Sequence, residues 1–380
     1  MNGNFALRPR GVWLVTSLEL RQRVRSIRWY VALGLWTLAL IVLGLIVLLP
    51  TWRFGGDINA VREVAAVMFS MLALVVLFAV LLVLPALSAG SINGDRTAGT
   101  LATLQATLLS PFEIVIGKLL AGWITGIAFI ILALPSLVPT ALLGGIDVFY
   151  LLRVLLVLVF LAFCIVALGL GLSSLTNRQL GSVVLTYVVV LGTSVILPVV
   201  WGSSAAVLNY QREVTIYETH YEEIAGADGE QAYRSECREG TMSETVFRMD
   251  LAQPLIWPNP VILLAETAPP IGPDGNPLIA GPDSADPHPT EILRLIKLGV
   301  DVSLTAHEGS EVRNHCSPED AGYPEGIARD SGYQGDPSKA FPVWPMGAAC
   351  WLLVGLGGVA VATRRLSVPI KRLGKGTRIA

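Results

Sequence analysis

Two glycine–lysine segments contain the residues that could bind the phosphates of a nucleotide. Gly117-Lys118 is followed by Leu119, and residues 373–377 read Leu-Gly-Lys-Gly-Thr. A P-loop needs Ser or Thr directly after the lysine and a further glycine upstream, because the hydroxyl binds Mg²⁺ and the backbone surrounds the phosphates. Neither segment meets these requirements. We therefore predict that the chain is not an ATPase and contains no catalytic residues.

All four histidines lie between residues 202 and 340, together with Cys237 and Cys316. His307, His315 and Cys316 are of types that bind zinc, but their spacing matches no common zinc motif. We therefore predict no metal site. In an oxidising compartment the two cysteines would pair, and the chain-entropy model gives such a disulfide about 4–5 kcal/mol of stabilisation. Two free thiols are the alternative.

The composition indicates a membrane protein. Of 380 residues, 53% are hydrophobic and 15% are charged, whereas soluble domains carry about 25% charged residues. The mean hydropathy is +0.61. A spanning helix needs roughly 20 mostly apolar residues, and six segments qualify: 29–49, 65–91, 119–143, 154–175, 180–201 and 341–363. The short turn at 176–179 predicts a helical hairpin.

The positions of Lys and Arg predict the orientation of these spans. Residues 1–28, residues 364–380 and the loops containing Arg96, Lys118 and Arg178 hold 15 basic and three acidic residues. An even number of spans places all these segments on one side, which we expect to be cytoplasmic with a net charge of +12. The predicted location is the cell membrane. The overall net charge of −2 suggests no nucleic-acid partner.

Residues 202–340 differ in charge from the rest of the chain. They contain 23 acidic and 9 basic residues, a net charge of −14, and the predicted topology places them outside the cytoplasm. Val214 to Tyr221 has strand-like β-branched and aromatic content. Residues 290–299 predict a short amphipathic helix that ends at Gly299. Pro269 to Pro289 predicts an irregular loop.

Residues 92–118 hold the most informative pattern. Gly94 and Gly99 mark the end of the long second span. Three leucines then fall on one face of a short helix, at Leu101, Leu104 and Leu108. In the run Ser110-Pro111-Phe112-Glu113, the serine is typical of an N-cap, the proline of the first helical position and the glutamate of a capping box. A short apolar-faced helix followed by a new helix start needs a surface to pack against, either the bilayer or a partner protein.

This loop resembles the signature of the permease subunits of ABC-2-type transporters. The matching runs are Asp95-Arg96-Thr97-Ala98-Gly99-Thr100-Leu101, Leu108-Leu109-Ser110-Pro111 and Gly117-Lys118. Thr97 stands where many members carry a second acidic residue. In that family the segment is a coupling helix that docks on an ATPase subunit. The resemblance implies an ATPase-coupling role for Asp95, Arg96, Gly99, Thr100, Leu101, Leu104, Leu108, Ser110, Pro111, Glu113, Gly117 and Lys118.

The resemblance also covers the six spans and the basic amphipathic stretch at 11–28, which is similar to the family's interfacial connecting helix. A basic juxtamembrane leash is the alternative for that stretch. The resemblance implies two ABC ATPase subunits, which bind ATP-Mg, acting on two six-span units. This chain would then form a dimer with itself or a relative, and would need no cofactor of its own. Small residues in the fourth and sixth spans would serve that dimer or packing within one subunit.

We therefore expect an all-α polytopic membrane protein with six transmembrane helices, a cytoplasmic coupling helix and a mixed α/β or irregular extracytoplasmic domain. The predicted units are a cytoplasmic N-terminus with an interfacial helix (1–28), spans one to five with a coupling loop at 93–118 (29–201), the extracytoplasmic domain (202–340), span six (341–363) and a basic tail (364–380).

The expected function is that of the membrane-spanning subunit of an ATP-driven exporter. The near absence of ionisable residues in the spans disfavours an ion-coupled transporter and suits a lipid-like or amphipathic substrate. The alternative is a membrane-anchored receptor or assembly factor that acts through residues 202–340. A membrane enzyme with lipid substrates is disfavoured, because no paired catalytic groups are visible.

Overall fold

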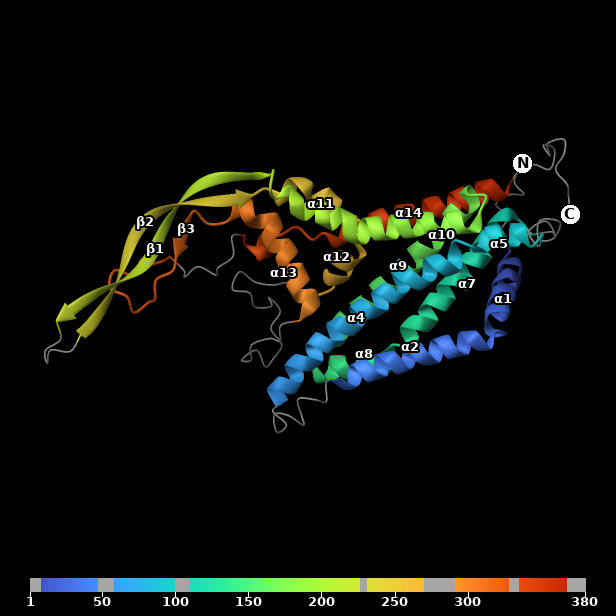
Figure 1. The fold of residues 1–380 in the computed structure, drawn as a ribbon, viewed down its shortest axis with the longest axis horizontal. Helices are drawn as coiled ribbons and strands as arrows, with labels where there is room; N and C mark the ends of the chain where they lie inside the picture. Colours follow the sequence, from blue (N-terminus) through green and yellow to red (C-terminus); the bar gives the residue numbers. More distant parts are fainter. Residues whose placement is uncertain are drawn as a thin grey trace.

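The computed structural model describes residues 8–46, 58–99, 109–225, 231–269, 291–327 and 335–367. Long helices form an elongated bundle, and a pair of strands projects from one end of it (Figure 1). We call this the sheet end, and we call the other end, where α1 and α5 lie, the junction end. The bundle helices are α1 (Pro9–Val24), α2 (Ile27–Leu45), α4 (Ile58–Ser88), α5 (Ser91–Thr97), α7 (Pro111–Ile131), α8 (Leu134–Leu143), α9 (Val148–Leu175), α10 (Gln179–Leu191), α11 (Leu197–Ser204) and α14 (Trp344–Leu366).

Five helices in the described part of the chain are long and apolar enough to cross a membrane. They are α4 continued by α5, then α7, α9, α10 continued by α11, and α14, and they match five of the six predicted spans. The predicted first span is α2, which follows α1 after a bend of 78°. Six spans are reached only if that bent pair is counted as one. The fold is therefore that of a polytopic membrane protein with at least five candidate spans.

The predicted helical hairpin at 176–179 is confirmed, since α9 ends at Leu175 and α10 begins at Gln179. Two predicted spans are less regular than the sequence indicated. The segment 119–143 is broken at residues 132–133 into α7 and α8, and Pro135 occupies the first turn of α8, where its missing N–H costs nothing.

The fifth predicted span contains a π-helical turn, Gly192–Ile196, between α10 and α11. Pro198 follows this turn, and a proline has no N–H to donate to the carbonyl four residues earlier, that of Ser194. The side-chain amide of Asn259 donates to the carbonyls of Thr193 and Ser194, at 3.2 Å each. Asn259 is 2% exposed. A residue from a distant segment therefore supplies hydrogen bonds to carbonyls of the π-helical turn.

The main core lies among α4, α7, α9 and α14. α9 and α14 approach each other closely, since a Cβ on Gly171 would lie 2.6 Å from the Cα of Gly358. The small residues of the fourth and sixth spans therefore pack against each other within one subunit. Any larger residue at Gly171 would push these two helices apart.

The sheet domain has three strands in the order β2-β1-β3. The antiparallel strands β1 (Asn209–Ala225) and β2 (Gln231–Phe247) include the predicted strand Val214 to Tyr221. The short strand β3 (Val312–Asn314) pairs in parallel with β1. The long β1–β2 hairpin extends away from the helices (Figure 1).

Between the hairpin and α14, the chain forms short helices that return to the bundle: η4 (Met249–Leu255), α12 (Pro260–Ala265), α13 (Ile292–Thr305), η5 (Ala306–Glu308) and η6 (Pro337–Lys339). Leu263, Leu264 and Leu293 belong to the same hydrophobic core as the spans. The prediction that the 290–299 helix ends at Gly299 is wrong, because α13 continues to Thr305. Val300 and Leu304 pack against Ile256 and Ile262 in a second cluster, and this burial outweighs the low helix propensity of glycine. The predicted loop from Pro269 to Pro289 lies almost entirely outside the described residues.

Candidate functional site

The junction end brings together the residues of the permease-like motif that the structure describes. Its first part is α5, whose backbone N–H groups at Ile92 and Asn93 both donate to Ser173 Oγ of α9, at 3.3 Å. The Asn93 amide donates to Thr176 Oγ1 at 2.9 Å, and Arg96 donates to the Thr176 carbonyl at 3.4 Å. α5 is therefore held against the α9–α10 turn.

The start of α7 has the predicted capping box. Ser110 Oγ accepts from the Glu113 N–H at 3.1 Å, and Glu113 Oε2 accepts from the Ser110 N–H at 2.8 Å, with Pro111 in the first helical turn. Glu113 also accepts the backbone N–H of Arg8 at 2.7 Å and the Arg8 guanidinium at 3.2 Å. This fully buried carboxylate therefore joins the start of α7 to the start of α1.

α1 packs directly on α7 because residue 117 is glycine. A Cβ at Gly117 would lie 2.6 Å from the Val15 Cβ and 3.1 Å from the Val12 carbonyl oxygen. The Thr16 hydroxyl donates to the Gly117 carbonyl at 3.1 Å, and Thr16 is fully buried. The glycine of the Gly-Lys pair thus allows a close helix crossing.

The lysine of that pair links three helices. The Lys118 ammonium lies 2.5 Å from Asp95 Oδ2 of α5 and also pairs with Glu19 of α1. The Lys118 side chain is 2% exposed, whereas Glu19 and Asp95 are 16% and 24% exposed. We use the name α1–α5–α7 junction for Arg8, Glu19, Asp95, Glu113 and Lys118.

The remaining predicted coupling residues fall on the chain between α5 and α7. α5 ends before Gly99, which has a φ of 72°, in the left-handed region that favours glycine. Thr100, Leu101, Leu104 and Leu108 lie outside the described residues, and the prediction of a short helix there stays a prediction. α5 and the capped start of α7 border this stretch on both sides.

α1 packs one side against α7 and leaves the other side exposed. Val12, Val15 and Thr16 are buried against α7, while Trp13, Leu14 and Leu18 are exposed. Arg10, Arg21 and Arg25 lie on this exposed side as well, so the position of α1 in the membrane interface stays a prediction.

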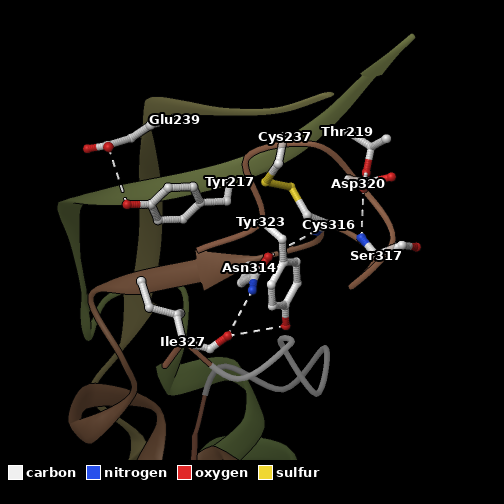
Figure 2. Close-up of a disulfide and its surroundings, with 10 residues drawn as sticks. All are labelled: Tyr217, Thr219, Cys237, Glu239, Asn314, Cys316, Ser317, Asp320, Tyr323 and Ile327. Carbon is white, nitrogen blue, oxygen red and sulfur yellow. Dashed lines mark hydrogen bonds between the residues drawn. A yellow bond between two sulfur atoms is a disulfide. The ribbon is translucent and has the colours of Figure 1, made fainter. Parts of the chain in front are cut away.

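The sheet domain contains a disulfide between Cys237 and Cys316, with a Cα–Cα distance of 5.8 Å (Figure 2). It links β2 to the segment that follows β3, across the central strand β1. On the same segment Asp320 accepts hydrogen bonds from Thr219 Oγ1 and the Ser317 N–H, at 2.6 and 2.8 Å. The disulfide and these hydrogen bonds fix the segment to the hairpin.

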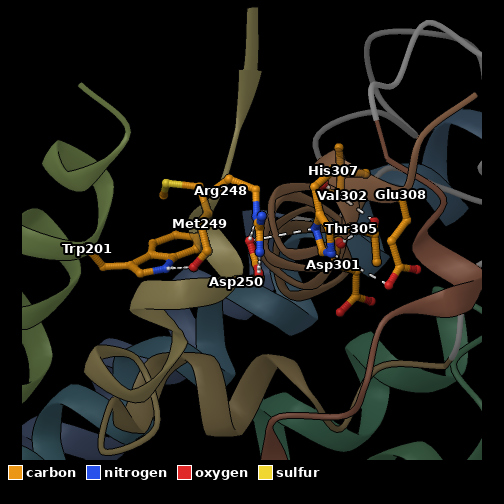
Figure 3. A network of polar contacts seen from close by, with 9 residues as sticks. All are labelled: Trp201, Arg248, Met249, Asp250, Asp301, Val302, Thr305, His307 and Glu308. Carbon is orange, nitrogen blue, oxygen red and sulfur yellow. Dashed lines mark hydrogen bonds and ion pairs between the residues drawn. The ribbon is translucent and has the colours of Figure 1, made fainter. Parts of the chain in front are cut away.

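The zinc-type residues do not gather into a site. Cys316 is in the disulfide, and His307 lies 3.6 Å from Asp250 and 3.7 Å from Glu308 (Figure 3). Within the described ranges, no group of three or more His, Cys, Asp or Glu residues is arranged to hold a metal. Burial alone would raise the pKa of Asp250, but hydrogen bonds from Arg248 hold that pKa below its usual value.

The sheet end has its own buried charges, which the sequence did not indicate. The Lys297 ammonium lies 3.2 Å from Glu266 Oε1 and 3.4 Å from Asp301 Oδ2, and we call these three residues the Lys297 cluster. Burial raises the pKa of Asp301 to about 6, although Lys297 acts in the opposite direction.

Glu291 lies at the start of α13 and is 1% exposed. It accepts hydrogen bonds from Tyr150 of α9 and, at 2.8 Å, from Ser70 of α4. Burial raises the pKa of Glu291 despite these donors. A carboxyl group from the sheet end thus reaches into the helix bundle, where the sequence showed almost no ionisable residues.

Sequence reasoning also missed Arg8, Thr16 and Glu19 as partners of the motif. They lie about 100 residues before the groups they contact, and neither spacing nor periodicity reports contacts over that distance. In comparisons with known proteins, no family model matches the chain and no curated protein matches it. The fold by itself defines a membrane protein with a small disulfide-linked sheet domain.

Proposed function

We propose that this chain is the membrane-spanning permease subunit of an ABC-2-type exporter, in which a separate ATPase subunit binds and hydrolyses ATP-Mg. One observation carries the proposal: the motif residues Asp95, Glu113 and Lys118 converge on α1 at a single end of the bundle. A loop that transmits force needs rigid attachments on both sides, and the α1–α5–α7 junction supplies them.

In this proposal the 93–110 segment docks on the ATPase, and ATP-driven closure of the ATPases displaces it. The ion pair between Lys118 and Asp95 passes the displacement to α7, and the pair with Glu19 passes it to α1. The bond from Arg96 to Thr176 passes it to the α9–α10 turn. A second six-span unit would complete the exporter, with the junction end in the cytoplasm and the sheet end outside.

Co-purification with candidate ATPases tests this proposal. Leu101→Glu and Leu104→Glu place a charge on the face expected to dock, and each should abolish complex formation and stimulated ATP hydrolysis. The matched control is Leu251→Glu, because Leu251 is 60% exposed and lies in η4 at the sheet end. Unchanged ATPase binding by both loop variants would overturn the coupling assignment.

The second candidate is a membrane-anchored receptor or assembly factor that acts through the sheet domain. The observation in its favour is the long β1–β2 hairpin that projects beyond the bundle (Figure 1). Replacement of residues 212–244 by a short glycine–serine linker, together with Cys316→Ala, separates the candidates. A permease would still bind its ATPase, whereas a receptor would lose its only activity.

A further inference from the structure

A pocket of about 490 Å³ lies between α9, α12 and α14 at the sheet end of the bundle and opens to the surface. Its volume is in the range of small-molecule sites, roughly 300–1,000 Å³. The inner walls are apolar and consist of Leu156, Val157 and Phe160 of α9, Leu263 of α12 and Ala348 of α14.

The polarity of the pocket changes along the helix axes. Arg153 lies in the second turn of α9 and Trp344 in the first turn of α14, toward the sheet end. Phe160 is seven residues further along α9, which places it about 10 Å deeper. A ligand that fills this pocket therefore needs a polar group at the rim and an apolar part beyond it, in the orientation that a phospholipid has in a bilayer.

The rim carries one cation that is available for a ligand. Arg153 is exposed and lies over the Tyr150 ring, 5.8 Å from its centroid. Within the described residues it forms no ion pair, and its guanidinium is suited to bind a phosphate.

The opposite wall carries a buried carboxylate with an unused acceptor. The Glu266 side chain is 2% exposed, and its Oε1 accepts from Lys297. In the part of the chain that the structure describes, Glu266 Oε2 is buried and has no hydrogen-bond partner. A buried acceptor without a donor is unfavourable, so a ligand with N–H groups would complete it.

From these features we infer that the pocket binds one phospholipid of the ethanolamine type, with the phosphate on Arg153, the primary ammonium on Glu266 and an acyl chain along Leu156 and Phe160. A choline headgroup has no N–H to donate, and a glycerol headgroup has no positive charge for the carboxylate. The site does not depend on the export function proposed above.

The test uses the full-length protein in nanodiscs that contain equal amounts of ethanolamine, choline and glycerol phospholipids with identical acyl chains. Native mass spectrometry then counts the lipids retained after mild delipidation. We expect one ethanolamine lipid per chain, enriched about tenfold over the other two, which is the effect of one charge-assisted hydrogen bond.

Glu266→Gln should abolish the preference for ethanolamine over choline lipid, and Arg153→Gln should weaken retention of all three lipids. Ala348→Trp fills the pocket without touching a charge and should abolish retention, which keeps the test independent of any folding defect in Glu266→Gln. The matched control Arg178→Gln removes an exposed arginine at the junction end and should leave retention unchanged. Equal retention of choline lipid by the unmodified protein, or an ethanolamine preference that survives Ala348→Trp, would overturn the inference.

Discussion

The bundle has a buried lysine at each end, Lys118 and Lys297, and each of them lies between two carboxylates. The surroundings of the two lysines differ. Lys118 joins groups from three separate helices, and both of its partners are partly open to water. Lys297 shares α13 with one partner, Asp301, while its other partner is Glu266; these carboxylates are 5% and 2% exposed. The same charge pattern therefore makes a solvated linkage at one end and an enclosed anionic cluster at the other.

This difference has an energetic consequence. Water stabilises the surplus negative charge beside Lys118, because Glu19 and Asp95 are partly exposed. The surplus charge of the Lys297 cluster has no such access, and Glu266 Oε2 and Asp301 Oδ1 have no hydrogen-bond partner among the described residues. A buried charge without compensation costs several kcal/mol. Removal of the lysine should therefore destabilise the fold more at the Lys297 cluster than at Lys118.

The largest effect is expected from Lys297→Met. It leaves two buried carboxylates without their ammonium and should lower the free energy of unfolding by about 3–5 kcal/mol, measured by denaturant titration in detergent. The control is Lys339→Met, because Lys339 is 58% exposed and pairs only with Asp336 among the described residues. If Lys297→Met were no more damaging than this control, the Lys297 cluster would not be an enclosed one.

Lys118→Met should lower the free energy of unfolding by less, about 2 kcal/mol, because the two carboxylates that pair with Lys118 are partly solvated. It should also loosen α1 and α5 relative to α7. Hydrogen–deuterium exchange would then increase in residues 9–24 and 91–97 and stay unchanged in α13. Exchange that rises equally at both ends would show that Lys118 acts on global stability alone.

A pH titration distinguishes the two ends further. Burial raises the folded-state pKa of Asp301 from its usual value of 3.8 to about 6. This group therefore stabilises the fold fully below about pH 4 and loses that contribution as the pH rises to about 6. A rise of this size corresponds to at most about 3 kcal/mol. Asp301→Asn should remove this slope from the melting temperature measured between pH 4 and 7.

The control for that titration is Asp336→Asn. A hydrogen bond from Ser338 is the main cause that lowers the pKa of Asp336, so this carboxyl group does not titrate in the same window and the slope should persist. A slope of unchanged size in Asp301→Asn would assign the pH dependence to another group.

The smallest effect is expected from Thr16→Val at the junction end. The substitution keeps the side-chain volume and removes the hydrogen bond to the Gly117 carbonyl, which should cost about 1 kcal/mol. Gly117→Ala is the informative contrast, because its Cβ would meet Val15 at 2.6 Å. A thermal shift for Thr16→Val as large as that for Gly117→Ala would contradict the role given to the close helix crossing.

The elements that depend on local patterns were predictable from the sequence. The apolar runs predicted five of the candidate spans, and Ser110, Pro111 and Glu113 predicted the start of α7 because a capping box acts within one helical turn. The strand at Val214 to Tyr221 followed from its composition. The sequence also placed Cys237 and Cys316 as the candidate pair.

Contacts over long sequence distances were not predictable. Asn259 reaches the π-helical turn across more than 60 residues, and Glu291 reaches Tyr150 across 141. Both residues come from a segment that composition alone assigned to an outer domain, yet they pack into the bundle. α13 continues beyond Gly299 because Val300 and Leu304 are buried in the second hydrophobic cluster.

The disulfide can form only after both of its cysteines have been synthesised. Its two cysteines are 79 residues apart, and at 5–20 residues per second Cys316 is synthesised about 4–16 s after Cys237. On the proposed topology, Cys237 therefore waits as a reduced thiol in an oxidising compartment while its partner is still on the ribosome. No other cysteine lies within residues 202–340, so during this interval the nascent domain cannot form a wrong disulfide with itself, and a wrong partner would have to come from outside the domain.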